Sequence, residues 1–246
     1  MNDLIYKHPM DGVRYTKPVR APDDIHFLTR DEQIRFFEVA KRSHNYNQYA
    51  LILETGLRTG EMIGLTWDAI DFQNRTLTVN KTLEYRHKQH FWRPGSPKTQ
   101  QSYRTIPLTD RAYEILKEIK DKLPWQKESP LLSQTLEYID RRTGAISRLV
   151  MRDLVFINWR TGEPAKNSSY DTHLYKLCDE AGIEKFCMHA LRHTYATRAN
   201  ESGVQPKVLQ KLLGHASIKT TMDRDVHVTS ESLDQAVRQF ESGRVS

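Results

Sequence analysis

Three basic side chains fall within one turn of a single predicted helix. His189, Arg192 and His193 lie in the stretch MHALRHTYATRAN, residues 188–200. On a helix His189 and Arg192 share one face, with His193 beside them. A guanidinium offers two N–H groups to two oxygens, and an imidazole donates or accepts a proton. This combination is typical of an anion site. The alternative interpretation is that some of these histidines fill satisfied positions in the core.

A short helix is expected just after this stretch, over residues 206–213. Pro206 suits the first position of a helix, and Gly214 suits the residue that ends one. His215 then follows the helix end on a tight turn, from which it could face the same target. The apolar residues of this helix are predicted to form its buried stripe: Val208, Leu209, Leu212 and Leu213.

Arg58 is a further candidate for a functional charge. A helix from about residue 48 to Thr55 is predicted to end at Gly56, and the next residues, LRTGEMIGL, lead into another short helix. A loop held between two helices is a good place for a functional side chain. The alternative is a surface arginine paired with Glu61.

The hydrophobic period then changes to two. Thr76–Asn80 and Arg104–Ile106 read as strands, joined by a basic and aromatic excursion. Its turn is predicted at Pro94–Gly95 and Pro97, which places Lys98 near the tip, on a mobile element. Cations interleaved with aromatic rings would suit a surface that tracks a polyanion, and a solvated hairpin face is the alternative. The cations are Lys81, Arg86, Lys88, Arg93, Lys98 and Arg104.

Residues that suit the first and last positions of a helix predict the remaining helices. Thr29 and Glu32 form a capping box, Thr109 caps a helix that ends near Leu123, and a helix over 168–181 ends at Gly182. Between the last two, buried segments are expected at Leu131–Leu132 and 154–157, with an inserted polar excursion between them.

Composition limits the function classes. The chain has 246 residues, a formal net charge of +6 and a sequence pI near 9.2, which favours a polyanionic partner. It shows no apolar run of the roughly 20 residues that a membrane helix needs and no signal-peptide pattern, so no membrane partner and a cytoplasmic location are expected. Cys178 and Cys187 form no CxxC pair.

Several catalytic motifs are missing. The sequence has no glycine-rich phosphate loop and no GxSxG. His189 and His193 have the spacing of a zinc pair, but HALRH lacks the glutamate of HExxH and carries an arginine. We therefore expect no metal site, although a metal-dependent hydrolase using these histidines is one rival hypothesis.

Taken together, four segments resemble the catalytic domain of the tyrosine recombinases, the integrases of phages and conjugative transposons. They are TGLRTGEMIGLTW around Arg58, SPKTQQSYRTIPL around Lys98, MHALRHTYATR around Arg192 and LLGHASIKTTM around His215. Each motif is weak alone, but four in the right order are specific. The resemblance implies a mainly α fold with a small antiparallel β-sheet (α+β).

The resemblance also implies a role for each matched residue. Arg58 and Arg192 would clamp the non-bridging oxygens of a scissile DNA phosphate, and His215 would hydrogen-bond it. Lys98 would protonate the departing 5′ oxygen, and His189 would accept the proton of the nucleophile. Glu61 would support the site from behind. Phosphoryl transfer of this kind depends on positioning and charge, so neither a metal nor another cofactor is implied.

One position departs from the family pattern. The nucleophilic tyrosine is expected in TTMDxYxH, and this chain reads TTMDRDVH, with Asp225 in that place. No tyrosine occurs after Tyr195. A carboxylate is ionised at neutral pH and is repelled by a phosphate. We therefore predict that the chain cannot cleave and rejoin DNA, either as an introduced inactive mutant, which the otherwise complete site favours, or as a naturally dead paralogue.

The resemblance divides the chain into three parts. Residues 1–28 would be the linker from a missing N-terminal core-binding domain, 29–228 the catalytic domain, and 229–246 a tail helix that docks on its own domain or in trans. Double-stranded DNA and a homo-oligomer, dimer to tetramer, are the implied partners. The second rival hypothesis is a non-enzymatic DNA-binding protein that uses residues 204–227 as a helix-turn-helix.

Overall fold

The chain folds as helices packed against small antiparallel sheets, as the sequence predicts. A computed structural model describes residues 26–122, 129–158, 160–224 and 226. Its helices are α1 (Arg30–Ala40), α2 (Tyr46–Thr55), α3 (Thr59–Ile63), α4 (Asp110–Asp121), α5 (Asn167–Ala181), α6 (Met188–Glu201), α7 (Pro206–Leu213) and α8 (Ile218–Arg224), with 3-10 turns η1 (Trp67–Ala69), η2 (Gln100–Ser102) and η4 (Met151–Asp153). None of the helices described is long and apolar enough to span a bilayer.

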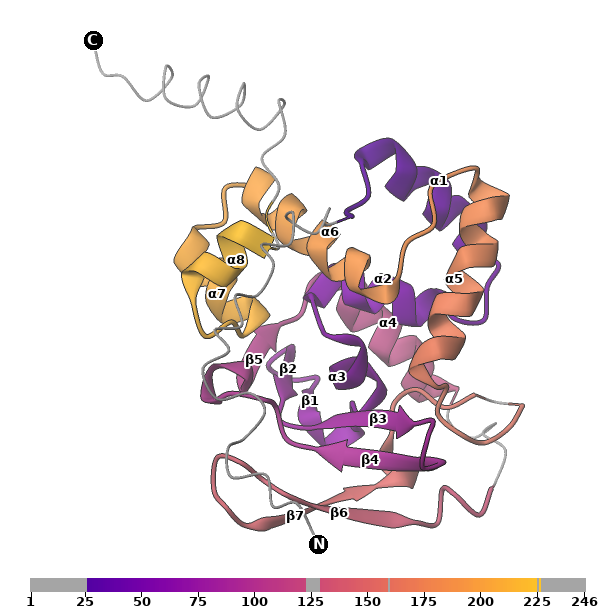
Figure 1. Cartoon of the computed structure of the whole chain (residues 1–246), viewed down its shortest axis with the longest axis vertical. Coiled ribbons are helices and arrows are strands. Elements are labelled where there is room, and N and C mark those ends of the chain that lie inside the picture. The colour runs from indigo at the N-terminus through magenta and orange to yellow at the C-terminus, as the bar shows by residue number, and fades with distance from the viewer. Residues whose placement is uncertain (1–25, 123–128, 159, 225, 227–246) are drawn as a thin grey trace, which may run out of the picture.

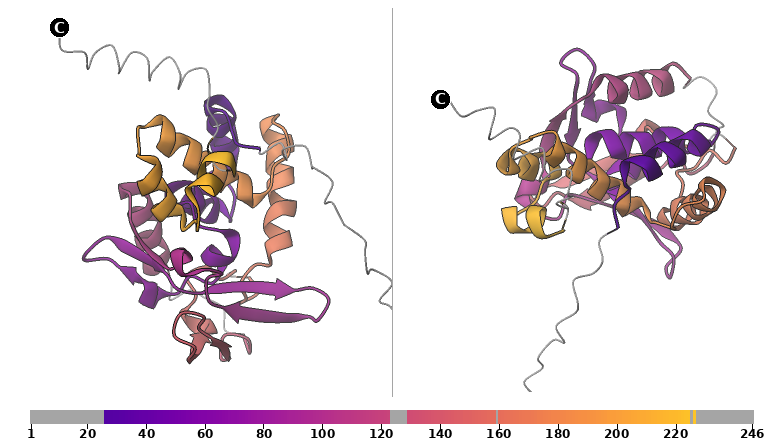
Figure 2. Two further views of the ribbon diagram at one scale, coloured as in Figure 1. Left: turned by 60° about the vertical axis from the view of Figure 1, so that its left-hand side comes forward. Right: turned by 90° about the horizontal axis from the view of Figure 1, so that it is seen from above.

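The strands form separate small sheets rather than one. They are β1 (Ile70–Asp71), β2 (Thr76–Val79), β3 (Thr82–Arg86), β4 (Phe91–Gly95), β5 (Arg104–Pro107), β6 (Thr135–Ile139) and β7 (Ile146–Val150). The order β1-β2-β5 gives one antiparallel sheet, and β3-β4 and β6-β7 are two hairpins. The β3-β4 and β6-β7 hairpins lie below the helices in Figure 1, and the β3-β4 hairpin extends outward in Figure 2.

Local sequence explains where the helices begin and end. Thr29 and Glu32 form the predicted capping box of α1, and Thr109 caps α4. Helices α2 and α7 end at Gly56 and Gly214, each with a positive φ, which glycine adopts without a steric penalty. Leu209 and Leu213 of α7 are fully buried, but Val208, which was predicted to be buried, is 46% exposed.

The turn of the basic excursion lies elsewhere than predicted. Strand β3 pairs with β4 up to Arg86 and Phe91, so the chain reverses at His87–His90, where His90 has a φ of 56°. Pro94 lies inside β4 opposite Leu83, which an edge strand tolerates because proline there loses no needed N–H bond. Lys98 therefore lies beyond β4, at the end of the hairpin opposite its tip.

The first described residues are attached to α6. The backbone N–H of Leu28 donates to Thr194 Oγ1 at 2.9 Å, and Arg198 donates to the Leu28 carbonyl at 2.7 Å. Leu28 is completely buried in the main hydrophobic core. The first predicted part of the chain, residues 1–28, therefore ends on the helix that carries the predicted anion site, and residues 1–25 lie outside the described residues.

Candidate functional site

Arg192 and His215 meet in the interior. Arg192 lies on α6 and is 1% exposed, and its guanidinium donates to His215 Nε2 at 2.8 Å. The same guanidinium donates to the carbonyls of Gly56 at 2.5 Å and Leu213 at 2.7 Å. One side chain thus joins the end of α2, the end of α7 and the turn that carries His215.

The tautomer of His215 follows from its partners. A guanidinium has no acceptor, so Nε2 accepts from Arg192 and Nδ1 carries the ring proton. Nδ1 then donates to Thr221 Oγ1, 3.0 Å away on α8, and Thr221 is completely buried. Thr221 stands one helical turn before position 225. Asp225 itself lies outside the described residues, but Val226 packs against a small cluster of Ala196, Leu209 and Leu213 from α6 and α7.

Arg58 is held by Glu61, as the alternative interpretation expected. Arg58 precedes α3, where its backbone N–H and its guanidinium donate to the two carboxylate oxygens of Glu61 at 2.9 and 2.8 Å. The arginine side chain remains 36% exposed while that of Glu61 is 2% exposed. The pairing therefore presents the arginine at the surface from a buried anchor, which leaves a functional role open to it.

Glu61 also binds a second arginine, Arg104, whose location differs from the one that the sequence predicts. Arg104 was predicted among the exposed cations of the basic excursion, but it is buried and donates to both carboxylate oxygens of Glu61, at 3.1 and 2.8 Å. The alternation of buried and exposed residues along the strand could have indicated this burial. Ile106 is buried, and Arg104 stands two residues before it, on the same face of β5.

The three arginines determine the charge state of Glu61. Burial alone would raise the pKa of this carboxyl, but Arg104, then Arg58 and Arg192, lower the pKa to about 2. Glu61 is therefore ionised at neutral pH. Its negative charge acts on both arginines predicted to clamp a phosphate, through a hydrogen bond from Arg58 and electrostatically on Arg192.

The end of α7 is bound by side chains from two other segments. Arg104 Nε donates to the Leu212 carbonyl at 2.6 Å, Arg192 to that of Leu213, and Ser102 Oγ to that of Gly214 at 3.2 Å. The last carbonyls of a helix have no intrahelical partners and carry partial negative charge. Two guanidiniums satisfy them here, which holds the turn before His215 in place.

His189 and Lys98 lie at the surface. His189 is exposed on the first turn of α6, with its ring edge-to-face with that of His193, the centroids 4.5 Å apart. Lys98 is exposed, and its carbonyl accepts from Arg141 at 3.4 Å. The segment from Lys98 continues directly into Ser102 and Arg104, which are hydrogen-bonded to the end of α7.

Most of the predicted polyanion-tracking cations already have carboxylate partners. Lys81 pairs with Asp68 at 2.9 Å, and Arg86 and Arg93 both pair with Glu84. Together with Arg104 on Glu61, these pairs reduce the charge that the excursion offers to a polyanion. Lys98 remains exposed, so it is the better candidate for a contact with an external phosphate.

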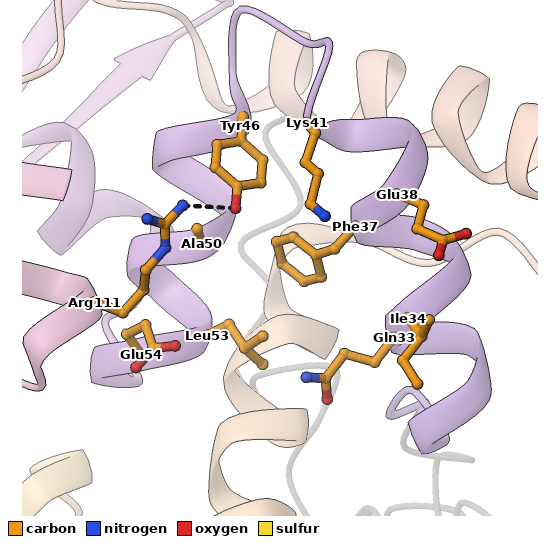
Figure 3. Close-up of a pocket in the computed structure, with 10 residues that line it drawn as sticks. All are labelled: Gln33, Ile34, Phe37, Glu38, Lys41, Tyr46, Ala50, Leu53, Glu54 and Arg111. Carbon is orange, nitrogen blue, oxygen red and sulfur yellow. Dashed lines mark hydrogen bonds between the residues drawn. The ribbon is translucent and has the colours of Figure 1, made fainter. Parts of the chain in front are cut away.

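A groove elsewhere on the molecule does not belong to this cluster. It has a volume of about 310 Å³ and lies between α1, α2 and the start of α4 (Figure 3). Arg111 on its wall donates to Tyr46 Oη at 2.8 Å, and the other charges are mixed. The lining residues are Gln33, Ile34, Phe37, Glu38, Lys41, Tyr46, Ala50, Leu53, Glu54 and Arg111.

Two observations bear on the rival hypotheses, the metal-dependent hydrolase and the helix-turn-helix DNA-binding protein. Within the part of the chain that the structure describes, no three His, Cys, Asp or Glu side chains are grouped as a metal centre requires. Helices α7 and α8 are separated by four residues, as in a helix-turn-helix, but α8 has seven residues and uses Thr221 to bind His215.

Comparison with known proteins gives a family match over most of the chain. The model of the phage integrase family matches residues 26–231. A "Tyrosine recombinase XerC-like" protein of Caldanaerobacter subterraneus subsp. tengcongensis is 29% identical over 242 residues, and the transposase from transposon Tn916 of Enterococcus faecalis is 27% identical over 243. Each alignment covers 94% of this chain, which spans 59% and 55% of those two relatives.

Solved structures agree with this match. The Tn1549 transposon integrase in complex with transposon right end DNA has a TM-score of 0.70 and 25% identity, over 96% of this chain and 73% of that one. The XerA recombinase has a TM-score of 0.63 at 22% identity, over 89% of this chain and 66% of that one, a likeness of fold.

Proposed function

Since this chain belongs to the phage integrase family, we propose that it derives from a site-specific DNA recombinase that cuts and rejoins DNA through a 3′-phosphotyrosine intermediate. The reaction would serve the integration and excision of a mobile element, as the names of the relatives suggest. The observation that carries the proposal is the meeting of Arg192 with His215, in a network that continues through Arg104 and Glu61 to Arg58.

The proposed chemistry uses this network to hold one phosphate. In the parent reaction a tyrosine oxygen attacks the phosphorus and the bond to the 5′ oxygen breaks. His189 takes the tyrosine proton, and Lys98 gives a proton to the leaving oxygen. Arg58 and Arg192 stabilise the charge that builds on the non-bridging oxygens, and losing one such donor commonly costs about a hundredfold or more in rate.

His215 can hydrogen-bond the phosphate only together with a change of tautomer. Its Nε2 accepts from Arg192 in the structure, whereas a hydrogen bond to a phosphate oxygen requires a proton on Nε2. Thr221 permits the change, because its hydroxyl can donate to Nδ1 as well as accept from it. We infer that phosphate binding and this proton shift occur together.

The residue at position 225 makes the chain cleavage-dead on this proposal. An aspartate carboxylate is shorter than a tyrosine and is repelled by the phosphate anion. An acyl phosphate formed from it would be prone to hydrolysis and would not preserve the DNA bond. The chain would still bind double-stranded DNA and assemble as a homo-oligomer on it.

Restoring the nucleophile tests the proposal. The Asp225→Tyr variant and the parent chain are incubated with nicked suicide duplexes drawn from the DNA that flanks the gene. We expect a covalent protein–DNA adduct with tyrosine and none with aspartate. If neither protein forms an adduct on a duplex that both bind, the recombinase assignment is wrong.

A second variant tests the role of Arg192 in the tyrosine background. Because Arg192 is 1% exposed and holds two carbonyls, Arg192→Ala would remove structural bonds as well as a charge. Arg192→Lys keeps the charge and loses the fork that spans several acceptors. We expect a loss of adduct of about a hundredfold or more, with a cooperative unfolding transition retained. Normal adduct yield would mean that the role is misassigned.

A further inference from the structure

Arg104 joins two halves of the candidate site and lies outside the set of residues that the sequence motifs assigned. One half is Glu61, which holds Arg58, and the other is the end of α7, which leads to His215. We propose that Arg104 is a positioning residue that keeps Arg58 and His215 in register around a single phosphate-sized anion. This inference rests on the proposed function, because it takes that anion to be the scissile phosphate.

The Arg104 guanidinium donates hydrogen bonds to two groups, the Glu61 carboxylate and a carbonyl at the end of α7. Nη1 and Nη2 donate to the Glu61 carboxylate at 3.1 and 2.8 Å, and Nε donates to the Leu212 carbonyl at 2.6 Å. A lysine ammonium is a single point of charge and cannot span a carboxylate and a helix-end carbonyl together. The chemistry of the contacts therefore requires arginine.

Arg104 acts through its neighbours and not on a ligand. Its side chain is 4% exposed and that of Glu61 is 2% exposed, whereas Arg58 is 36% exposed. The positive charge of Arg104 offsets the negative charge of Glu61. Without it, Glu61 would neutralise Arg58, and the exposed guanidinium would attract an external anion less strongly.

Gly214 supplies independent support, because its backbone packs closely against the Arg104 side chain. A Cβ at this position would lie 3.0 Å from Arg104 Cδ and 3.0 Å from Nη1, and its φ is +68°. Ser102 Oγ binds the Gly214 carbonyl from the segment just before Arg104. The turn before His215 therefore packs directly on the arginine.

The test measures anion binding without any DNA cleavage, with tungstate as the probe. Tungstate is titrated into the parent chain while NMR follows the His215 ring and the Arg58 Nε–H signals. We expect both signals to respond with one midpoint. In Arg104→Lys, which keeps the charge, we expect binding to weaken about tenfold and the two midpoints to separate, and Arg104→Gln to bind more weakly still.

Arg198 provides a matched control. It too binds a carboxylate and a backbone carbonyl, those of Glu201 at 2.9 Å and Leu28 at 2.7 Å, and these partners lie outside the cluster of Glu61, Arg104 and His215. Arg198→Lys should lower the free energy of unfolding and leave tungstate binding and the single midpoint unchanged. A loss of stability alone therefore does not reproduce the expected result.

The outcomes separate this inference from the proposed function. Parent-like affinity with coincident midpoints in Arg104→Lys would overturn the positioning role, as would a parent chain in which tungstate moves neither signal. A split of midpoints in Arg104→Lys together with no adduct from Asp225→Tyr would retain the positioning role and remove the recombinase assignment.

Discussion

At the scale of single residues, the main feature is a carboxylate buried among arginines. Glu61 binds Arg58 and Arg104, and Arg192 contributes to its low pKa. A buried charge is costly unless it is paired and hydrogen-bonded, and here both carboxylate oxygens have guanidinium donors. The cluster has more positive than negative charge, which suits a site that takes an additional anion.

The low pKa of Glu61 makes stability depend on pH. A carboxyl whose pKa falls from 4.5 to about 2 on folding stabilises the fold above pH 4.5, and this contribution is lost as the pH falls toward 2. The shift corresponds to a contribution on the order of 3 kcal/mol to the free energy of unfolding. We expect Glu61→Gln to be less stable than the parent at pH 7 and the difference to shrink between pH 5 and 2, measured by urea unfolding. A difference that stays constant over this range would contradict the assignment.

At the scale of elements, helix ends bring the site residues together. Arg192 on α6 binds the carbonyl of Gly56 at the end of α2, and the ring of Tyr195 packs against the same glycine. Gly56 has a φ of +64°, and a Cβ there would lie 2.5 Å from Tyr195 Cδ1. The glycine that ends α2 is therefore also a packing surface for α6.

Two glycines with the same backbone conformation allow a matched test. Gly56→Ala should lower the free energy of unfolding by about 3 kcal/mol or more, because strain at positive φ and a clash with Tyr195 add together. Gly182 ends α5 with a φ of +63° and has no atom within 4 Å of a built Cβ. Gly182→Ala should cost about 1 kcal/mol, from strain alone. Equal losses in urea unfolding would show that the contact with Tyr195 does not matter.

Elements with local signals were the predictable part of the fold. The capping box at Thr29, the cap at Thr109 and the glycine ends at Gly56, Gly182 and Gly214 lie as predicted, because each depends on a few neighbouring residues. The hairpin turn was placed wrongly, because proline and glycine also suit the end of an edge strand.

The candidate site was predictable only where motifs supplied it. Arg192 and His215 were expected near each other, and Arg192 Nη2 lies 2.8 Å from His215 Nε2. The charge of Arg104 predicts a surface position, whereas the alternation of β5 places it on the buried face with Ile106. Its burial depends on Glu61, 43 residues earlier in the chain, and no local pattern reveals such a partner.

At the scale of the whole molecule, net charge governs the expected binding of DNA. The formal net charge is +6, and several cations of the β3-β4 region are paired with carboxylates. A protein that neutralises phosphates releases counterions, so its affinity falls as salt rises. The exposed cations should therefore set the salt dependence.

Two lysines on this surface distinguish exposed from paired charge. Lys98 is exposed, so Lys98→Gln should reduce the slope of log affinity against log salt by about 0.9, the value for one phosphate contact. The Lys81 side chain is 10% exposed and pairs with Asp68, so Lys81→Gln should leave the slope unchanged. Fluorescence anisotropy with a labelled duplex measures both, and equal slopes for the two variants would argue against a phosphate contact by Lys98.

The attachment of Leu28 to α6 has a mechanical consequence. Any pull on the polypeptide before residue 26 enters the domain over residues 26–28, where the His26 ring stacks on Phe186 and the amide and carbonyl of Leu28 are hydrogen-bonded to Thr194 and Arg198. Thr194 stands two residues after Arg192, so part of this tension passes to α6, the helix that carries Arg192. Tension on the preceding residues would thus bear on the helix that positions Arg192 against His215.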